Sequence, residues 1–273
     1  GGDVGTVTKS PIVLKQAYMQ YDLADAGVSL LLGKQALGTI WTADFTGTAA
    51  KVLVTPVDGL TVAAFAVDSV EGGSGDGDAA NFANAGLKTD GIQGFVGAPA
   101  LNNRLYKYNM YGAAVLSNFA GLDLQLWGNY WDKTAVLYAA NLNYKLALGG
   151  KDNVGIKVTY LGNALQGDLK DTIIGTDADT AGNVKVSDIA ANGNLVDGRI
   201  FANVAGLDAK IGGIYFGKKE KFTINTLEDP SGSDLYIGRQ MFYNKGSWLA
   251  LSAGQNIFGY VGVGYTLPAN IRT

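Results

Sequence analysis

Much of this chain alternates apolar and polar residues in segments of about ten residues, separated by turn-forming stretches. Leu122, Leu124 and Leu126, for example, alternate with Asp123 and Gln125. Successive side chains of a strand point to opposite faces, so a period of two produces a sheet with one apolar and one polar face. The pattern predicts about eleven strands and no sustained helix.

The connections between these segments alternate between short turns and long polar loops. Short turns are predicted at 22–27, 55–59 and 149–153, where Gly, Asp, Asn and Pro supply turn conformations. Long loops are predicted at 69–103, 162–198 and 217–245, and a loop of moderate length at 35–49. Tight turns on one side and long loops on the other are typical of outer-membrane barrels. We therefore predict an all-β fold, a transmembrane antiparallel β-barrel, with residues 1–273 in one barrel domain.

A soluble β-sandwich is the alternative, because its polar face would lie in water and its apolar face in a core. The chain has no run of about 20 apolar residues, and a barrel strand needs only about 9–11 residues with a weak alternating signal. Aromatic side chains near the predicted strand ends favour the membrane, where they would lie at the lipid–water boundary, although strands are rich in aromatic residues anyway. They are Tyr18, Tyr21, Trp41, Tyr106, Tyr108, Tyr111, Trp127, Tyr130, Trp131, Tyr160, Tyr215, Tyr260 and Tyr265.

Composition excludes several classes of function. The chain contains no histidine, which rules out Ser-His-Asp triads and zinc sites with His ligands. It contains no cysteine, which rules out disulfides and thiolate metal sites. A net charge of −3 argues against nucleic acid as a partner. Catalysis would need carboxylates, Lys or Tyr, and we expect that the protein is not an enzyme.

Charged residues fall on the polar face of the predicted strands. In a barrel this face lines a water-filled lumen, where fixed charges set ion selectivity. In a sandwich the same face would simply be solvated, so these residues alone do not decide between the two folds. The pore-lining candidates are Lys15, Lys51, Asp123, Lys145, Lys157, Arg199, Asp208 and Lys210.

Several blocks of sequence, in their order along nearly the whole chain, resemble the major outer-membrane porin of the campylobacter group. They include Gly33-Lys34-Gln35, Ile40-Trp41-Thr42, Tyr130-Trp131-Asp132, Tyr160-Leu161-Gly162-Asn163 and Gly217-Lys218-Lys219-Glu220-Lys221. The resemblance implies a barrel of eighteen antiparallel strands in the bacterial outer membrane, assembled as a homotrimer. It implies a general diffusion pore with a mild preference for cations, narrowed by an inward-folded loop that corresponds to residues 35–49.

The resemblance also implies a calcium ion near the constriction. Carboxylate oxygens on loops suit calcium, although a solvated loop explains most acidic loop residues equally well. The residues that match the family's calcium-binding positions are Asp44, Glu228 and Asp229. The other expected partners are the lipid bilayer with its lipopolysaccharide and the small hydrophilic solutes and cations that pass through the pore.

The chain covers fewer strands than the family, so we expect strands to be missing at both ends. An open sheet leaves unpaired backbone groups that a bilayer does not tolerate, and the remaining strands or another chain would have to close it. The alternative function is a surface adhesin or antigen whose long loops bind a host or phage partner. Channel conductance distinguishes the two.

Overall fold

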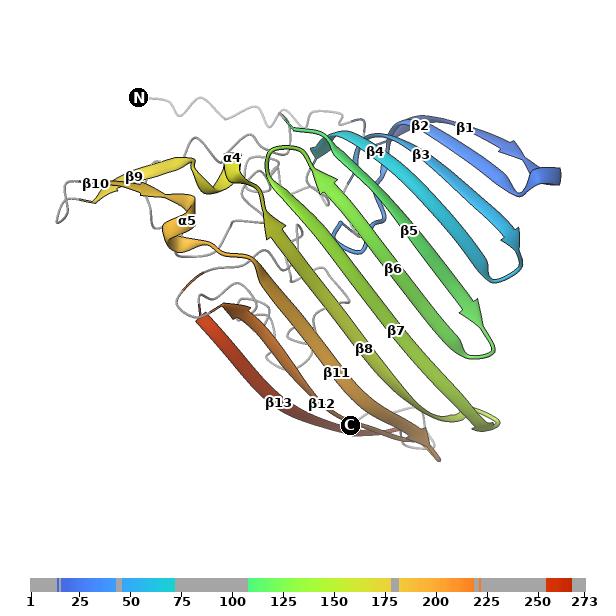
Figure 1. Cartoon of the computed structure of the whole chain (residues 1–273). Coiled ribbons are helices and arrows are strands. Elements are labelled where there is room, and N and C mark those ends of the chain that lie inside the picture. The colour runs from blue at the N-terminus through green and yellow to red at the C-terminus, as the bar shows by residue number, and fades with distance from the viewer. Residues whose placement is uncertain are drawn as a thin grey trace, which may run out of the picture.

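The computed structural model describes residues 14, 16–42, 46–71, 108–177, 182–218, 221 and 254–266. Within them, eleven strands form one sheet in which every neighbouring pair is antiparallel, and two further strands form a small separate hairpin (Figure 1). The order in the large sheet follows the chain, β1-β2-β3-β4-β5-β6-β7-β8-β11-β12-β13. The predicted antiparallel all-β fold and the predicted strand number are confirmed.

The elements of this sheet and of its connections have the following bounds. The strands are β1 (Ala17–Leu23), β2 (Val28–Ala36), β3 (Thr46–Val57), β4 (Leu60–Glu71), β5 (Met110–Phe119), β6 (Leu122–Trp131), β7 (Ala135–Gly149), β8 (Asp152–Leu165), β9 (Ile173–Asp177), β10 (Gly182–Lys185), β11 (Gly193–Val204), β12 (Leu207–Lys218) and β13 (Gly254–Tyr265). The short helices are η1 (Ala24–Ala26), α4 (Gly167–Lys170) and α5 (Val186–Ile189). No helix among the described residues is long and apolar enough to cross a membrane.

Short turns join the strands at one end, which we call the turn edge (Figure 1). The connections 37–45 and 166–192 lie at the opposite end, the loop edge, together with the short turn 132–134. The β5–β6 turn consists of Ala120 (φ 49°) and Gly121 (φ 83°), and the β11–β12 turn of Ala205 (φ 52°) and Gly206 (φ 84°). Positive φ at both central residues is the type I′ geometry, which matches the twist of the two strands that it joins.

Several strands extend further than the sequence predicts. β8 continues to Leu165 and β11 already begins at Gly193, so both enter the segment 162–198 that was predicted as a loop. That segment also contains the β9–β10 hairpin and both α-helices. Likewise the connection between β2 and β3 covers 37–45 rather than 35–49. In the segment 162–198, Gly, Asp and Asn led to the wrong boundaries, because they usually mark turns but here lie within strands. The bounds 35–49 came from the family resemblance.

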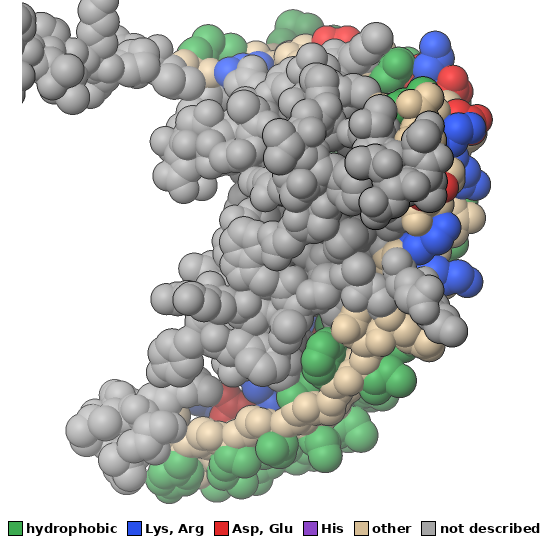
Figure 2. All heavy atoms as spheres, turned by 90° about the vertical axis from the view of Figure 1, so that its left-hand side faces the viewer, with side chains coloured by type: hydrophobic (Ala, Val, Ile, Leu, Met, Phe, Trp, Pro, Cys, Tyr) green, Lys and Arg blue, Asp and Glu red, His purple; other side chains and the backbone are tan. Residues whose placement is uncertain are grey.

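Apolar side chains predominate on the outer face of the sheet. Leu124, Leu142 and Val158 form one row across β6, β7 and β8. Ile200, Ile211 and Val261 form another across β11, β12 and β13, and these three side chains are 60–74% exposed. Figure 2 shows the described part as an arc, with hydrophobic side chains along the outer surface of its lower arm. Apolar side chains exposed in such rows require an apolar environment, which lipid provides.

The aromatic prediction is only partly right. Tyr111, Tyr130, Tyr160 and Tyr215 lie on the outer face towards the loop edge, and Tyr21 and Tyr265 lie on it towards the turn edge. The prediction was wrong for Tyr18, Trp127, Trp131 and Tyr260, which lie on the inner face. It was also wrong for Trp41 and Tyr108, which pack against the hydrophobic core of that face. Tyr106 lies outside the described residues. A strand alternates faces at every residue, so proximity to a strand end alone does not assign a side chain to lipid.

The hydrophobic core covers the inner face near the loop edge. Trp131, Leu137, Leu161 and Leu195 from β6, β7, β8 and β11 are each at most 2% exposed. Trp41, from the connection after β2, joins the same cluster. The inner face therefore differs from the outer one, because it is apolar only at one end and polar at the other.

Candidate functional site: the inner face of the sheet

The inner face carries all of the predicted pore-lining residues that the structure describes. These residues alternate along their strands with the apolar residues of the outer face, and the register places them on one side of the sheet. They are Lys51, Asp123, Lys145, Lys157, Arg199, Asp208 and Lys210, while Lys15 lies outside the described residues.

Three neighbouring rows across β7, β8 and β11 show how polarity changes along this face. The row nearest the loop edge is apolar and contains Ala139, Leu161 and Leu195. The next row contains Asn141, Thr159 and Asp197, and the third contains Asn143, Lys157 and Arg199. The face therefore passes from an apolar region, through a buried polar layer, to a charged region near the turn edge.

The buried polar layer is held by hydrogen bonds between strands. The Thr159 hydroxyl donates to Asn141 Oδ1 at 2.9 Å, and Asn141, Thr159 and Asp197 are 7%, 0% and 2% exposed. Buried polar groups are tolerated when such partners are present. This layer lies between the apolar region near the loop edge and the charged region near the turn edge.

Asp197 is a charged inner-face residue that the sequence interpretation missed. Its Oδ1 accepts a hydrogen bond from the Tyr260 hydroxyl at 3.0 Å, and its charge interacts with those of Arg199 and Lys157. It was missed because it fell within the predicted loop 162–198. The alternation of Leu195, Asp197 and Arg199 with apolar or small residues is the signal that could have identified the strand.

Glycine on β12 permits the bond between Tyr260 and Asp197. Arg199 faces Gly212, and Gly212 faces Tyr260, in one row across β11, β12 and β13. The Tyr260 ring lies where a side chain at Gly212 would be, and so reaches across β12 towards β11. In the same way the Phe201 ring covers Gly155. Aromatic cover of strand glycines compensates for their missing side chains.

The connection after β2 folds onto the inner face in its described part, 37–42. The ring centroids of Trp41 and Trp127 are 6.3 Å apart in an edge-to-face arrangement. Gln35 Nε2 donates to the Ala49 carbonyl at 2.9 Å, and Lys51 Nζ donates to the Ala36 carbonyl. Both hydrogen bonds join the end of β2, where the connection begins, to β3. The contact between Trp41 and Trp127 places the connection over the inner face.

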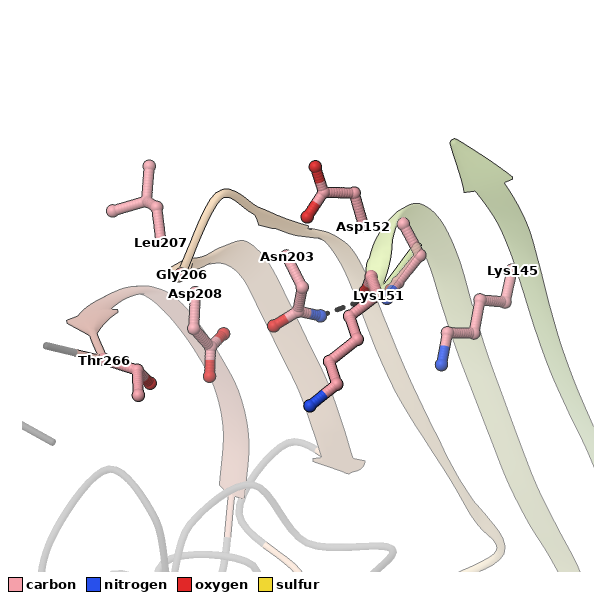
Figure 3. A pocket seen from close by; sticks show the side chains of 9 residues that line it. Lys145, Lys151, Asp152, Asn203, Gly206, Leu207, Asp208 and Thr266 are labelled. Atoms are coloured by element: carbon pink, nitrogen blue, oxygen red, sulfur yellow. Dashed lines mark hydrogen bonds between the residues drawn. The ribbon is translucent and has the colours of Figure 1, made fainter. Parts of the chain in front are cut away.

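An open hollow of about 510 Å³ lies at the turn edge (Figure 3). Lys145, Lys151, Asp152, Asn203 and Asp208 line it, together with residues of the β11–β12 turn. The bond drawn in Figure 3 runs from Asn203 Nδ2 to Asn153 Oδ1 and is 3.3 Å long. Four charged side chains, those of Lys145, Lys151, Asp152 and Asp208, therefore border this hollow at the turn edge.

The predicted calcium ligands Asp44, Glu228 and Asp229 lie outside the described residues. Among the residues that the structure does describe, no group of three or more acidic side chains is arranged to hold a metal ion. Calcium binding therefore stays a prediction.

One protein-family model matches nearly the whole chain. Residues 3–273 match the family model described as Campylobacter major outer membrane protein. A search of curated protein sequences finds no match.

Solved structures resemble the sheet at low sequence identity. OccK8 (OprE) of Pseudomonas aeruginosa matches with a TM-score of 0.59 and 14% identity, over 88% of this chain and 59% of that one. OccAB3 of Acinetobacter baumannii matches with a TM-score of 0.48 and 12% identity, over 70% of this chain and 42% of that one. The outer membrane protein OpdK of Pseudomonas aeruginosa matches with a TM-score of 0.45 and 17% identity, over 71% and 46%. The chain spans 42–59% of the length of these structures, and the likeness to OccK8 concerns the fold alone.

Proposed function

This chain belongs to the Campylobacter major outer membrane protein family, and from that premise we propose that it forms the wall of a passive diffusion pore. Its location is the bacterial outer membrane, and its sheet is part of a transmembrane antiparallel β-barrel. The observation that carries the proposal is the division between the two faces. Ile200, Ile211 and Val261 present apolar surface outward, while Lys157 and Arg199 project from the opposite face.

Passage through such a pore makes and breaks no bond. Ions and small hydrophilic solutes move along the charged inner face, which replaces part of their hydration. The connection at 37–42 narrows the passage, because Trp41 rests on the inner side of β6. The test is conductance of the protein, purified from outer membranes, in planar bilayers. Stepwise current increases are expected, and folded protein that inserts without conducting would refute the pore.

The finer proposal is a mild preference for cations. The resemblance supports it, and Asp123 and Asp208 on the inner face are acidic groups that would contribute. Replacing both with Asn should shift the reversal potential in a KCl gradient towards anions. Asp25→Asn, in the exposed turn η1, is the control and should leave the potential unchanged. A double variant with the parent's reversal potential would contradict a role for these two carboxylates.

We further propose a homotrimer with structural calcium held by Asp44, Glu228 and Asp229. Unheated samples should migrate as trimers in electrophoresis, and native mass spectrometry should give three copies. A chelator should lower the melting temperature of the parent, because removing a bound ion removes its stabilisation of the folded state. The variant Asp44→Asn/Glu228→Gln/Asp229→Asn should not respond to the chelator. An equal response in both would exclude these ligands.

Binding of a host or phage partner at the cell surface is the second candidate. The β9–β10 hairpin and helices α4 and α5 form a folded arm at the loop edge, beyond the ends of the membrane strands (Figure 1). Ile173 on this arm is 50% exposed. Deleting the arm should abolish partner binding and leave conductance intact if the arm serves adhesion.

A further inference from the structure

The hollow at the turn edge is bordered by charges of both signs. Lys145 lies on β7 and Lys151 in the β7–β8 turn, whereas Asp208 lies on β12. Figure 3 shows these three side chains and that of Asn203 extending to the same side of the sheet. Nine residues line the hollow, and all of them belong to the described part of the chain.

Hydrogen bonds between neighbouring turns hold the walls of this hollow in place. The Ala205 amide donates to Asp152 Oδ1 at 3.0 Å, which links the β11–β12 turn to the β7–β8 turn. The Thr266 amide donates to the Gly206 carbonyl at 2.9 Å, which links the end of β13 to the same β11–β12 turn. Because a site that is already ordered loses less conformational entropy when it binds, these links favour ligand binding.

Asn203 presents a carbonyl oxygen at the hollow. Its Nδ2 donates to Asn153 Oδ1 at 3.3 Å, and Asn153 Nδ2 donates to the Lys151 carbonyl at 3.0 Å. Asn153 is 8% exposed, so this series of bonds is anchored in a buried residue. With its Nδ2 engaged, Asn203 keeps Oδ1 as an acceptor. Asp208 lies directly opposite Asn203, so its carboxylate places further acceptors beside this oxygen.

The two lysines supply hydrogen-bond donors on the other side of the hollow. Both side chains are exposed, and neither Lys145 nor Lys151 forms an ion pair with a carboxylate of the described residues. Asp152 also borders the hollow, but its carboxylate extends away from both lysines in Figure 3 and accepts the bond from the Ala205 amide. Both ammonium groups can therefore donate to an anionic group of a ligand.

Charge complementarity selects the class of that ligand. Asp208 would repel a dianion, and the two lysines would repel a cation, because like charges brought together in a binding site cost free energy. A molecule with one carboxylate and one ammonium group matches both sides. The volume of about 510 Å³ lies within the range of small-molecule sites, roughly 300–1,000 Å³.

We propose that this hollow binds free amino acids in their zwitterionic form. The ligand's carboxylate accepts from Lys145 and Lys151, and its ammonium group donates to Asp208 and to Asn203 Oδ1. The short turns of outer-membrane barrels face the periplasm, so the site lies where a solute leaves the pore. The proposal rests on the pore function and adds a class of solute to it.

The test is binding of L-alanine to the protein purified from outer membranes, followed by saturation-transfer NMR. The titration is done at pH 7 and low ionic strength, where screening is weak. Propionate lacks the ammonium group of alanine, and ethylammonium lacks its carboxylate, so each of them probes one half of the site. Both should bind about tenfold more weakly than alanine, the size expected from losing two exposed charge contacts.

Variants locate the binding at the hollow. Lys145→Gln/Lys151→Gln should raise the dissociation constant of alanine about tenfold. Asp208→Asn should bring alanine and propionate to similar affinities, because the ammonium group loses its charged partner. Lys133→Gln/Lys170→Gln removes the same charge at the loop edge, in the 132–134 turn and in α4, and should leave alanine binding unchanged.

Every result either supports or overturns the site. Propionate that binds as tightly as alanine, or equal weakening in both double variants, overturns it. The comparison of the three ligands uses the parent alone, so it decides even where a variant does not fold. Conductance of the same preparation tests the pore separately. Normal conductance without alanine binding overturns the site and leaves the pore, whereas alanine binding without conductance overturns the pore and leaves the site.

Discussion

Replacing Tyr260 with Phe should destabilise the folded protein by about 2 kcal/mol, because a hydrogen bond to a charged group contributes ~1.5–3 kcal/mol. The lost bond joins the hydroxyl to Asp197 Oδ1 at 3.0 Å, and both residues are at least nine-tenths buried, at 9% and 2% exposed. The phenyl ring would still cover Gly212, so the change removes the bond and little packing. The free energy of unfolding in urea, measured in lipid vesicles, reports the loss.

A double-mutant cycle with Asp197→Leu isolates this interaction, because leucine has a similar size and carries no hydrogen-bond acceptor. The two single changes should be non-additive, with a coupling energy of about 1–2 kcal/mol, since each removes one partner of the same bond. Tyr144→Phe, on the exposed outer face, is the control and should cost less than about 0.5 kcal/mol. Additive single changes, or equal losses from both tyrosines, would show that Tyr260 does not hold Asp197 in place.

Three further predictions concern the two faces and the connection at 37–42. Leu142→Arg places a charge in the lipid-facing row and should cost ~2–4 kcal/mol of folding free energy in vesicles. Asn143→Arg, on the inner face, should cost far less, and equal costs would contradict the assignment of faces. Gly112→Val collides with the Phe65 ring and the Gly128 carbonyl oxygen, and should lower the free energy of unfolding by about 1–3 kcal/mol. Gly198→Val enters open space and should cause no clash. Unfolding in urea compares the two variants. Trp41→Ala should release the connection from the inner face and raise single-channel conductance, and an unchanged conductance would mean that this ring does not narrow the passage.

The sequence by itself determined the fold class and the division between the faces. A period of two leaves little freedom, because a shift of one residue would move every side chain to the opposite face. For this reason Lys51, Asp123, Lys145, Lys157, Arg199, Asp208 and Lys210 were all assigned to the correct side from alternation alone. Loop boundaries were less predictable, since Gly, Asp and Asn at 193–198 are turn formers that here belong to a strand.

Only the tertiary structure decided which of these residues meet. The pairing of Lys157 with Arg199 joins β8 to β11 across the connection that contains the β9–β10 hairpin, and the bond between Asp197 and Tyr260 spans 63 positions of the chain. Strand register and the glycine at position 212 set both contacts, and neither is a local property of the chain. The alternating pattern determines the face on which a side chain lies, but its neighbours depend on how distant strands align.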